Sequence, residues 1–503
     1  MKRILIIFLS SVLCVTVART QEVVYPEEVK AVFDKADADI TEYYLENGRN
    51  VAPSRLSGMK PVIAVPACEE AGYIKDMVSM AGGEPVDIED ITGMVSPAVN
   101  LRVEAARWDG VAMPDDWVRL GDEYSVLVYK TVTDRNLPYM GTSSLTGIID
   151  RGLKRMPCDV TSFEGLVRKA ALYRKASDLM DGILSTDSHC DLPDEYSKGW
   201  SVGKRNVSQC SIPKMDEGHL DAQVLISFLW QGPVNDASSR KAVKKNVERI
   251  GKIREDIAKY PDLCGLARTP DEAEALWKQG KKAFFIALEN GYGIGNDLGN
   301  IKKMKDLGIV YITLCHFNDN AICNTSSKKG SDPAKGLTEY GRKVVEEMNR
   351  QGIMIDLSHP SAGTFWDCIE LSKAPVICSH SGAKAINGHD RGLDDRQLKA
   401  LAENGGVIQI YTVPEYLCRA DATINDMMAH FNHCVEVAGA DHVGIGSDFD
   451  GGGGVWGCNG DNDLINVTMK MLEHGYTPEQ IKGFWGGNFM RVMRQVQSIA
   501  GQD

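Results

Sequence analysis

The chain has 503 residues, a net charge of −13 and 43% hydrophobic residues, and its length predicts two or three domains. The acidic balance argues against a nucleic-acid-binding protein, which needs a basic surface. Beyond the N-terminus, no stretch approaches the roughly 18 consecutive apolar residues of a membrane-spanning helix.

The N-terminus predicts export. Lys2 and Arg3 precede the apolar run Ile4–Val17, and small or polar residues follow from Ala18. This order is typical of a secretory signal peptide, here over residues 1–20. A single-pass anchor is the alternative, but the run is short for a membrane span. We therefore expect a periplasmic or secreted protein in which residues 21–58 form a helical leader.

Residues 59–160 predict a small α/β domain. Apolar runs at 60–65, 85–88 and 110–113 are typical of strands, and the intervening patterns predict helices at 69–81, 123–135 and 145–155. Strands that alternate with helices favour a flavodoxin-like, doubly wound arrangement. A second and larger domain is expected over residues 161–503.

The larger domain predicts a (β/α)8 TIM-type barrel. Eight apolar runs lie between about residues 183 and 448, and helical patterns at 336–351, 362–372, 396–404 and 424–438 separate several of them. Repeated strand–helix units with continuous apolar strands imply a parallel sheet covered on both sides. The runs begin near residues 183, 223, 282, 310, 352, 375, 406 and 443.

Several of these runs end in residues that bind metals. His189 and Asp191 point to the same side of a strand because side chains alternate, and such a pair is half of a zinc site. Glu289 follows six apolar residues, and a buried carboxylate needs a cation or hydrogen-bond donors. His359 and His380 end two further runs. The active site of a (β/α)8 barrel lies at these strand ends, so the sequence predicts a metal site there.

Residues from about 180 to 495 resemble the membrane (renal) dipeptidase family of zinc metallopeptidases. The similarity is collinear over the C-terminal two-thirds of the chain. The chain departs from the usual family pattern at Cys190, where Asn is usual, and at Asn290, where Gly is usual. The matching segments are Ser188–Pro193, Gly293–Asn300, Tyr311–His316, Ile355–His359, Ala374–His380, His442–Gly451 and Gly486–Asn488.

The resemblance implies two zinc ions in each chain. His189 and Asp191 would bind one ion, and His359 and His380 would bind the other. Glu289 would bridge them, since one carboxylate offers an oxygen to each of two ions about 3.5–4 Å apart. A hydroxide held between the ions would attack the peptide bond of a dipeptide.

The resemblance also implies roles for four residues around the metals. Asp448 would move the proton during attack and departure of the amine, and His316 would stabilise the developing oxyanion. Arg391 would bind the free carboxylate of the dipeptide, a task that suits a bidentate guanidinium. Tyr416, in the loop after the seventh strand, is expected to contact the substrate. Members of this family often form homodimers.

Two alternatives stay open from the sequence. Another amidohydrolase-type barrel could act on a lactam, a lactone or an N-acyl amino acid, and a barrel without catalysis could serve as a peptide-binding scaffold. A complete ligand set argues against the scaffold. The residue types do not separate zinc from manganese or cobalt, because mixed sites rich in carboxylates accept several divalent ions.

The smaller domain resembles a truncated class I glutamine amidotransferase of the γ-glutamyl hydrolase type. Pro61–Ala67, Asp134–Pro138 and the expected strand–turn–helix at Gly141 carry this similarity. That family needs a cysteine in a Gly-x-Cys-x-Gly turn, but Ser143 and Leu145 stand at the cysteine and the second glycine. Residues 22–182 also contain no histidine to act as a base. We therefore expect this domain to be catalytically inactive.

Overall fold

The structure is a computed structural model that describes two parts of the chain. Five short strands between residues 62 and 131 are described by their backbone, followed by residues 172–500 without 174, 193–199, 205–207, 328–330, 419–421 and 456. The chain divides into two compact units, Met1–Asp178 with Val455–Asn459, and Leu179–Gly454 with Gly460–Asp503. The expected signal peptide, the helical leader at 21–58, the helices at 69–81 and 145–155, the strand at 110–113 and the turn at Ser143 lie outside the described residues.

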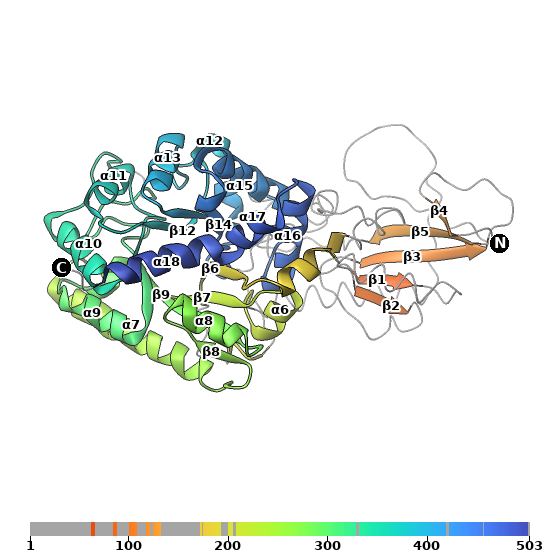
Figure 1. The fold of residues 1–503 in the computed structure, drawn as a ribbon, viewed down its shortest axis with the longest axis horizontal. Coiled ribbons are helices and arrows are strands. Elements are labelled where there is room, and N and C mark those ends of the chain that lie inside the picture. The colour runs from red at the N-terminus through yellow and green to blue at the C-terminus, as the bar shows by residue number, and fades with distance from the viewer. Residues whose placement is uncertain are drawn as a thin grey trace, which may run out of the picture. The chain divides into compact units, whose positions relative to one another are not determined.

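The strands of the N-terminal unit form one mixed sheet in the order β2-β1-β3-β5-β4 (Figure 1). β1 pairs in parallel with β2 and β3, whereas β5 is antiparallel to both β3 and β4. The parallel half agrees with the predicted α/β character, and the antiparallel half was not predicted. The bounds are β1 Val62–Val65, β2 Glu84–Asp87, β3 Asn100–Arg107, β4 Trp117–Leu120 and β5 Tyr124–Thr131.

The predicted helix over residues 123–135 is wrong, because Tyr124–Thr131 is the strand β5. Its sequence, Tyr-Ser-Val-Leu-Val-Tyr-Lys-Thr, is rich in aromatic and β-branched residues that favour strands. All eight of its residues pair with β3, an interaction with residues about 25 positions away that a local helical pattern cannot reveal. β3 and β4 were not predicted either, while β1 and β2 lie where strands were expected.

The C-terminal unit is a nearly closed barrel of eight parallel strands, which confirms the predicted (β/α)8 class (Figure 1). Each strand lies where the sequence predicted one, and β8 (Cys264–Leu266) is an additional short strand that pairs with β9. The barrel strands in order are β6 Thr186–Cys190, β7 Ala222–Phe228, β9 Lys282–Glu289, β10 Ile309–Thr313, β11 Met354–Asp356, β12 Ile377–Ser381, β13 Val407–Ile410 and β14 Val443–Ile445.

Backbone hydrogen bonds just beyond the ends of β6 and β14 complete the ring. The amide of Asp448 donates to the carbonyl of His189 at 3.0 Å, and the amide of Asp191 donates to the carbonyl of Phe449 at 2.8 Å. His189 lies near the end of the first barrel strand and Asp191 follows it, whereas Asp448 follows the last strand. This closure therefore brings residues from the two ends of the domain together.

Helices surround the barrel between its strands (Figure 1). The predicted helix at 424–438 has the same bounds as α15, which begins with a capping box between Thr423 and Asp426 and ends before Gly439 at φ 91°. None of the described helices is both long and apolar enough to cross a membrane. The main surrounding helices are α7 Asp236–Ile257, α8 Pro270–Trp277, α9 Gly299–Leu307, α10 Glu339–Gln351, α11 Ala362–Leu371, α13 Asp395–Glu403, α15 Ile424–Ala438 and α16 Leu464–Glu473.

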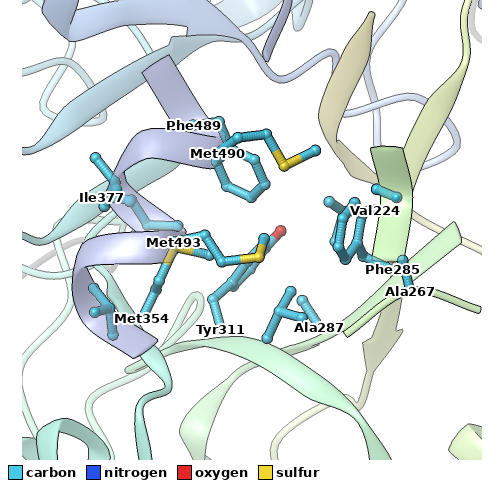
Figure 2. Close-up of a cluster of buried hydrophobic side chains, with 14 of the residues drawn as sticks. Val224, Ala267, Phe285, Ala287, Tyr311, Met354, Ile377, Phe489, Met490 and Met493 are labelled. Carbon is cyan, nitrogen blue, oxygen red and sulfur yellow. The ribbon is translucent and has the colours of Figure 1, made fainter. Parts of the chain in front are cut away.

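The C-terminal helix α18 (Asn488–Ile499) covers the N-terminal end of the barrel. Its residues Phe489, Met490 and Met493 lie in one buried cluster with strand residues (Figure 2). Many of the strand partners are the first residues of their strands, so α18 lies at the end opposite the predicted ligands. These first residues are Ala222, Met354, Ile377 and Val407.

Candidate metal centre

Five predicted ligands meet at the C-terminal end of the barrel. His189 and His380 lie within β6 and β12, Glu289 is the last residue of β9, and Asp191 and His359 follow β6 and β11 by one and three residues. Extended backbone places His189 and Asp191 on the same side of β6, as the sequence predicted, and their side chains are 3.9 Å apart.

Glu289 lies between two sets of histidines. Its Oε2 atom is 3.8 Å from Nε2 of His189. Its Oε1 atom is 3.0 Å from Nε2 of His359 and 3.4 Å from Nε2 of His380. The two oxygens of a single carboxylate therefore face different partners, and this is the arrangement that a bridging ligand requires.

The turn after β14 brings a third carboxylate to the site. Oδ1 of Asp448 is 4.0 Å from Nε2 of His189, and Asp448 has a left-handed backbone at φ 62°. Gly451 allows this close packing, because a Cβ atom there would lie 2.1 Å from Oδ2 of Asp191 and 2.3 Å from Oδ1 of Asp448. The strained turn thus aims Asp448 at the ligands.

Burial dominates the electrostatics of the site. It raises the pKa of Glu289 well above the usual range, and the neighbouring carboxylates of Asp191 and Asp448 raise this pKa further. Burial lowers the pKa of His189 and His380 well below the usual range, with the charge of Arg391 as a further cause. Neutral imidazoles and neighbouring carboxylates that are shielded from solvent are the electron-pair donors that bind a divalent cation.

The residues present fit a metal site. Three groups of ligand atoms each lie within 4.8 Å of one another. Among the described residues, the buried Nε2 atom of His189 has no hydrogen-bond partner, so its lone pair is available for a cation. The three groups are His189, Asp191 and Glu289; Glu289, His359 and His380; and His189, His380 and Asp448.

His316 stands beside the ligands within an aromatic rim. Its Nε2 atom is 3.8 Å from Oε1 of Glu289, and burial together with Arg391 lowers its pKa to about 3. The imidazole is therefore neutral. Phe317 and Trp230 stack at 6.2 Å next to it and are 36% and 67% exposed. These two aromatic residues were not singled out from the sequence, because an isolated apolar residue in a loop carries no signal.

Arg391 lies against His359 and His380. Its side chain is buried, and Nη2 is 3.2 Å from Nε2 of His359. Nε and Nη1 have no hydrogen-bond partner among the described residues, so the guanidinium has free donors for an anion. Tyr416, in α14 (Pro414–Leu417), places its ring 5.5 Å from the guanidinium. A cavity of about 530 Å³, which His389 also lines, adjoins Arg391.

The two departures from the family pattern leave the ligands in place. Asn290 adopts φ 74°, a conformation that favours glycine, and its side chain accepts a hydrogen bond from the amide of Tyr292 at 3.2 Å. Cys190 is fully buried, and its position between His189 and Asp191 in the strand directs its side chain to the other face.

Three positioning residues behind the ligands were not predicted. The Tyr311 hydroxyl contacts His189, the Ser379 hydroxyl contacts His189 and His380, and the Asp356 carboxylate binds Ser379. A polar residue inside an apolar run was the available signal, because Ser379 directly precedes His380 and Asp356 ends the run before His359.

Comparisons with known proteins find similarity over the C-terminal part of the chain. The model of the family described as membrane dipeptidase, peptidase family M19, matches residues 173–503. An uncharacterised dipeptidase of Schizosaccharomyces pombe is 36% identical over 308 residues, which is 59% of this chain and 74% of that protein.

Two solved structures share the barrel. The probable dipeptidase PvdM of Pseudomonas aeruginosa superposes with a TM-score of 0.62 at 25% identity, over 66% of this chain and 99% of that chain. A metallopeptidase of Rhodobacter sphaeroides, solved with a phosphinate mimic of L-Ala-D-Ala, has a TM-score of 0.57 at 23% identity, over 62% and 99% of the two chains. The second likeness concerns the fold.

Proposed function

The chain belongs to the membrane dipeptidase family, and from that premise we propose that its metal-dependent dipeptidase barrel works with two zinc ions. His189 and Asp191 bind one ion, His359 and His380 bind the other, and Glu289 bridges the pair. The observation that carries this proposal is that the two oxygens of the Glu289 carboxylate have different neighbours. Oε2 faces His189, while Oε1 faces His359 and His380. Bound zinc lowers the pKa of water towards neutrality and polarises a carbonyl.

Asp448 is proposed to move the proton. Burial, followed by the neighbouring charge of Asp191, raises the pKa of its carboxyl well above the usual range, so this group can take up a proton and later return it. Its position 4.0 Å from His189 places it beside the first ligand pair. The departing amine can then receive the proton without a second acid.

His316 and Arg391 are proposed to hold the substrate. A neutral His316 can donate one hydrogen bond to the oxyanion without competing with the metals for anions. Nε and Nη1 of Arg391 have no hydrogen-bond partner among the described residues, and these donors support binding of a free α-carboxylate. Tyr416 supports the guanidinium from one face. An enzyme that binds this carboxylate one residue beyond the scissile bond selects dipeptides over longer peptides.

The exposed pair Trp230 and Phe317 supports a preference for apolar side chains. These rings stand next to His316, on the side of the barrel formed by β7 and β10, whereas Arg391 follows β12. A substrate held at Arg391 therefore extends towards them. We expect kcat/KM to be higher for Leu-Ala than for Asp-Ala, and Phe317→Ser to reduce this ratio. An unchanged ratio in the variant would contradict a role of Trp230 and Phe317 in the choice of substrate side chain.

The experiment for the main proposal compares four substrates with zinc-loaded protein: Ala-Ala, Ala-Ala amide, Ala-Ala-Ala and N-acetylalanine. We expect zinc analysis to give two ions per chain and hydrolysis to be confined to Ala-Ala. Arg391→Lys should raise KM strongly, because a point charge cannot reproduce the planar fork. Arg396→Lys, on the exposed side of α13, is the matched control. Efficient cleavage of the amide or of N-acetylalanine would replace the dipeptidase assignment by the broader amidohydrolase alternative.

We also propose that the protein is exported and forms a homodimer. The charged start and the apolar run Ile4–Val17 support a cleaved signal peptide, and family membership supports the dimer. Mass spectrometry of protein recovered from the periplasm or medium should find a chain that begins near residue 20, and light scattering measures its oligomeric state. A full-length N-terminus on membrane-bound protein would favour an anchor.

A further inference from the structure

One hydroxyl group contacts a histidine from each of the two ligand pairs. Oγ of Ser379 is 2.9 Å from Nδ1 of His380 and 3.2 Å from Nδ1 of His189. His189 and Ser379 are 190 positions apart in the chain and meet because β6 and β12 face each other inside the barrel. The contacts are with Nδ1, so the Nε2 atoms of both histidines remain directed at Glu289.

The hydroxyl proton of Ser379 is donated to the carboxylate of Asp356. Oγ of Ser379 donates to Oδ2 of Asp356 at 2.6 Å, and the amide of Ser379 donates to Oδ1 at 2.7 Å. Thr313 also donates to this carboxylate at 2.5 Å, and Ser358 donates to it at 2.6 Å. A hydroxyl has one proton, so the remaining lone pairs of Ser379 can only accept. The histidine atoms that face it must therefore be Nδ1–H donors.

Tyr311 leads to the same tautomer at His189. Its hydroxyl donates to the carbonyl of Ser188 at 2.9 Å, and a carbonyl cannot donate in return. The phenol oxygen, 2.7 Å from Nδ1 of His189, is thus an acceptor as well. Nδ1 of His189 shares its proton between Tyr311 and Ser379, whereas Nδ1 of His380 contacts Ser379.

We propose that Ser379, fixed by Asp356, is a positioning residue that sets the Nδ1–H tautomer of one ligand in each metal pair. The inference rests on the proposed two-zinc site, and it adds that the two metal sites share one hydrogen-bond acceptor. A neutral imidazole binds a metal through the nitrogen without a proton, so this tautomer leaves both Nε2 lone pairs available. Loss of the Ser379 hydroxyl should weaken both sites together, whereas loss of the Tyr311 hydroxyl should weaken only the site of His189.

The test measures zinc release from the full-length, zinc-loaded enzyme as a chelator is added. In Ser379→Ala, both ions should be lost at chelator activities about 10–100-fold lower than in the wild type, the usual effect of removing a partner behind a ligand. Ser379→Thr keeps the acceptor and should stay close to wild type. Tyr311→Phe should shift the release of only one ion.

A second variant exchanges the donor and the acceptor in the hydrogen bond between residue 356 and Ser379. In Asp356→Asn, the side-chain amide can donate to Oγ of Ser379, which turns the serine proton towards the histidines and favours their Nε2–H form. Nitrogen NMR of protein labelled with ¹⁵N-histidine, recorded after zinc removal, should show Nδ1–H for His189 and His380 in the wild type and a shift towards Nε2–H in Asp356→Asn. A purely structural role would not change the tautomer.

The outcomes separate this inference from the proposed function. Fewer than two zinc ions in the wild type would overturn the two-zinc site itself. Two ions in the wild type, with a shift of one ion or of neither in Ser379→Ala, would overturn the shared acceptor and leave the dipeptidase proposal intact. Circular dichroism of each variant checks that it is folded, and Asp356→Asn decides the question if Ser379→Ala does not fold.

Discussion

Glu289 combines features that a side chain rarely keeps unless it binds a cation. It is 2% exposed, and burial and two neighbouring carboxylates raise its pKa. Glu289→Gln keeps the shape and removes the negative charge between the two ligand pairs. We expect kcat to fall by at least about 100-fold, as for other losses of a preorganised charge, with unchanged circular dichroism and less bound zinc. Glu403→Gln, on the exposed end of α13, is the control, and near wild-type turnover in Glu289→Gln would contradict a bridging role.

Gly451 is a residue whose missing side chain matters. An added Cβ would approach the carboxylates of Asp191 and Asp448 to 2.1 and 2.3 Å, so one of them must move. Gly451→Ala should therefore reduce zinc content and kcat together. Gly251→Ala is the matched control, because Gly251 lies in α7 with nothing within 4 Å of the added atom. If Gly451→Ala keeps full activity, the turn can relax without disturbing the ligands.

At the scale of elements, the two ends of the barrel have different tasks. The strand ends carry the ligands, while α18 covers the opposite end with apolar side chains. This separation agrees with the general division of such barrels into a catalytic and a stabilising face. Substitutions in α18 should accordingly change stability and leave the chemistry of the folded protein unaltered.

Phe489→Ala tests that division. Phe489 is fully buried in the cluster beneath the strands, and removing its ring should lower the free energy of unfolding by about 3–5 kcal/mol. Urea denaturation of the barrel measures this loss, and kcat per folded molecule should stay at the wild-type value. Gln495→Ala, on the exposed face of the same helix, should change stability by less than about 0.5 kcal/mol. A large fall in kcat without a loss of stability would show that α18 acts on the active site.

For the whole molecule, the metals should be part of the stability of the native state. Carboxylates of Glu289, Asp191 and Asp448 are held together only in the folded barrel, so the proposed zinc ions would bind the native state in preference to the unfolded chain. Each ion then contributes about 2.7 kcal/mol at a free concentration of 100 times its Kd. A chelator should lower Tm in calorimetry, and added zinc should restore it.

A double variant provides the control for the chelator experiment. His359→Ala with His380→Ala removes the second ligand pair, so its Tm should respond to zinc less than that of the wild type. A wild-type Tm that does not depend on zinc would mean that the ligand cluster is equally stable without cations.

The sequence by itself determined the barrel and its ligand-bearing ends. Apolar runs and helical periodicity depend on neighbours within about ten residues, so patterns such as Ile355-Asp-Leu-Ser-His359 identified both the strands and their polar ends. The C-terminal ends of parallel strands in a barrel lie at the same edge, and this rule predicts that His189, Glu289 and His380 come together. The strand β5 was missed because its pairing with β3 lies outside such local windows.

Only the tertiary structure decided how the ligands are oriented and held. The division of the Glu289 oxygens, the closure of β6 against the turn after β14, and the contact of Ser379 with His189 all join residues that are far apart in the chain. Hydrogen bonds depend on distances of about 3 Å and on the direction of each donor. Sequence periodicity specifies which face a side chain takes, but it does not specify which atom on another strand comes within that distance.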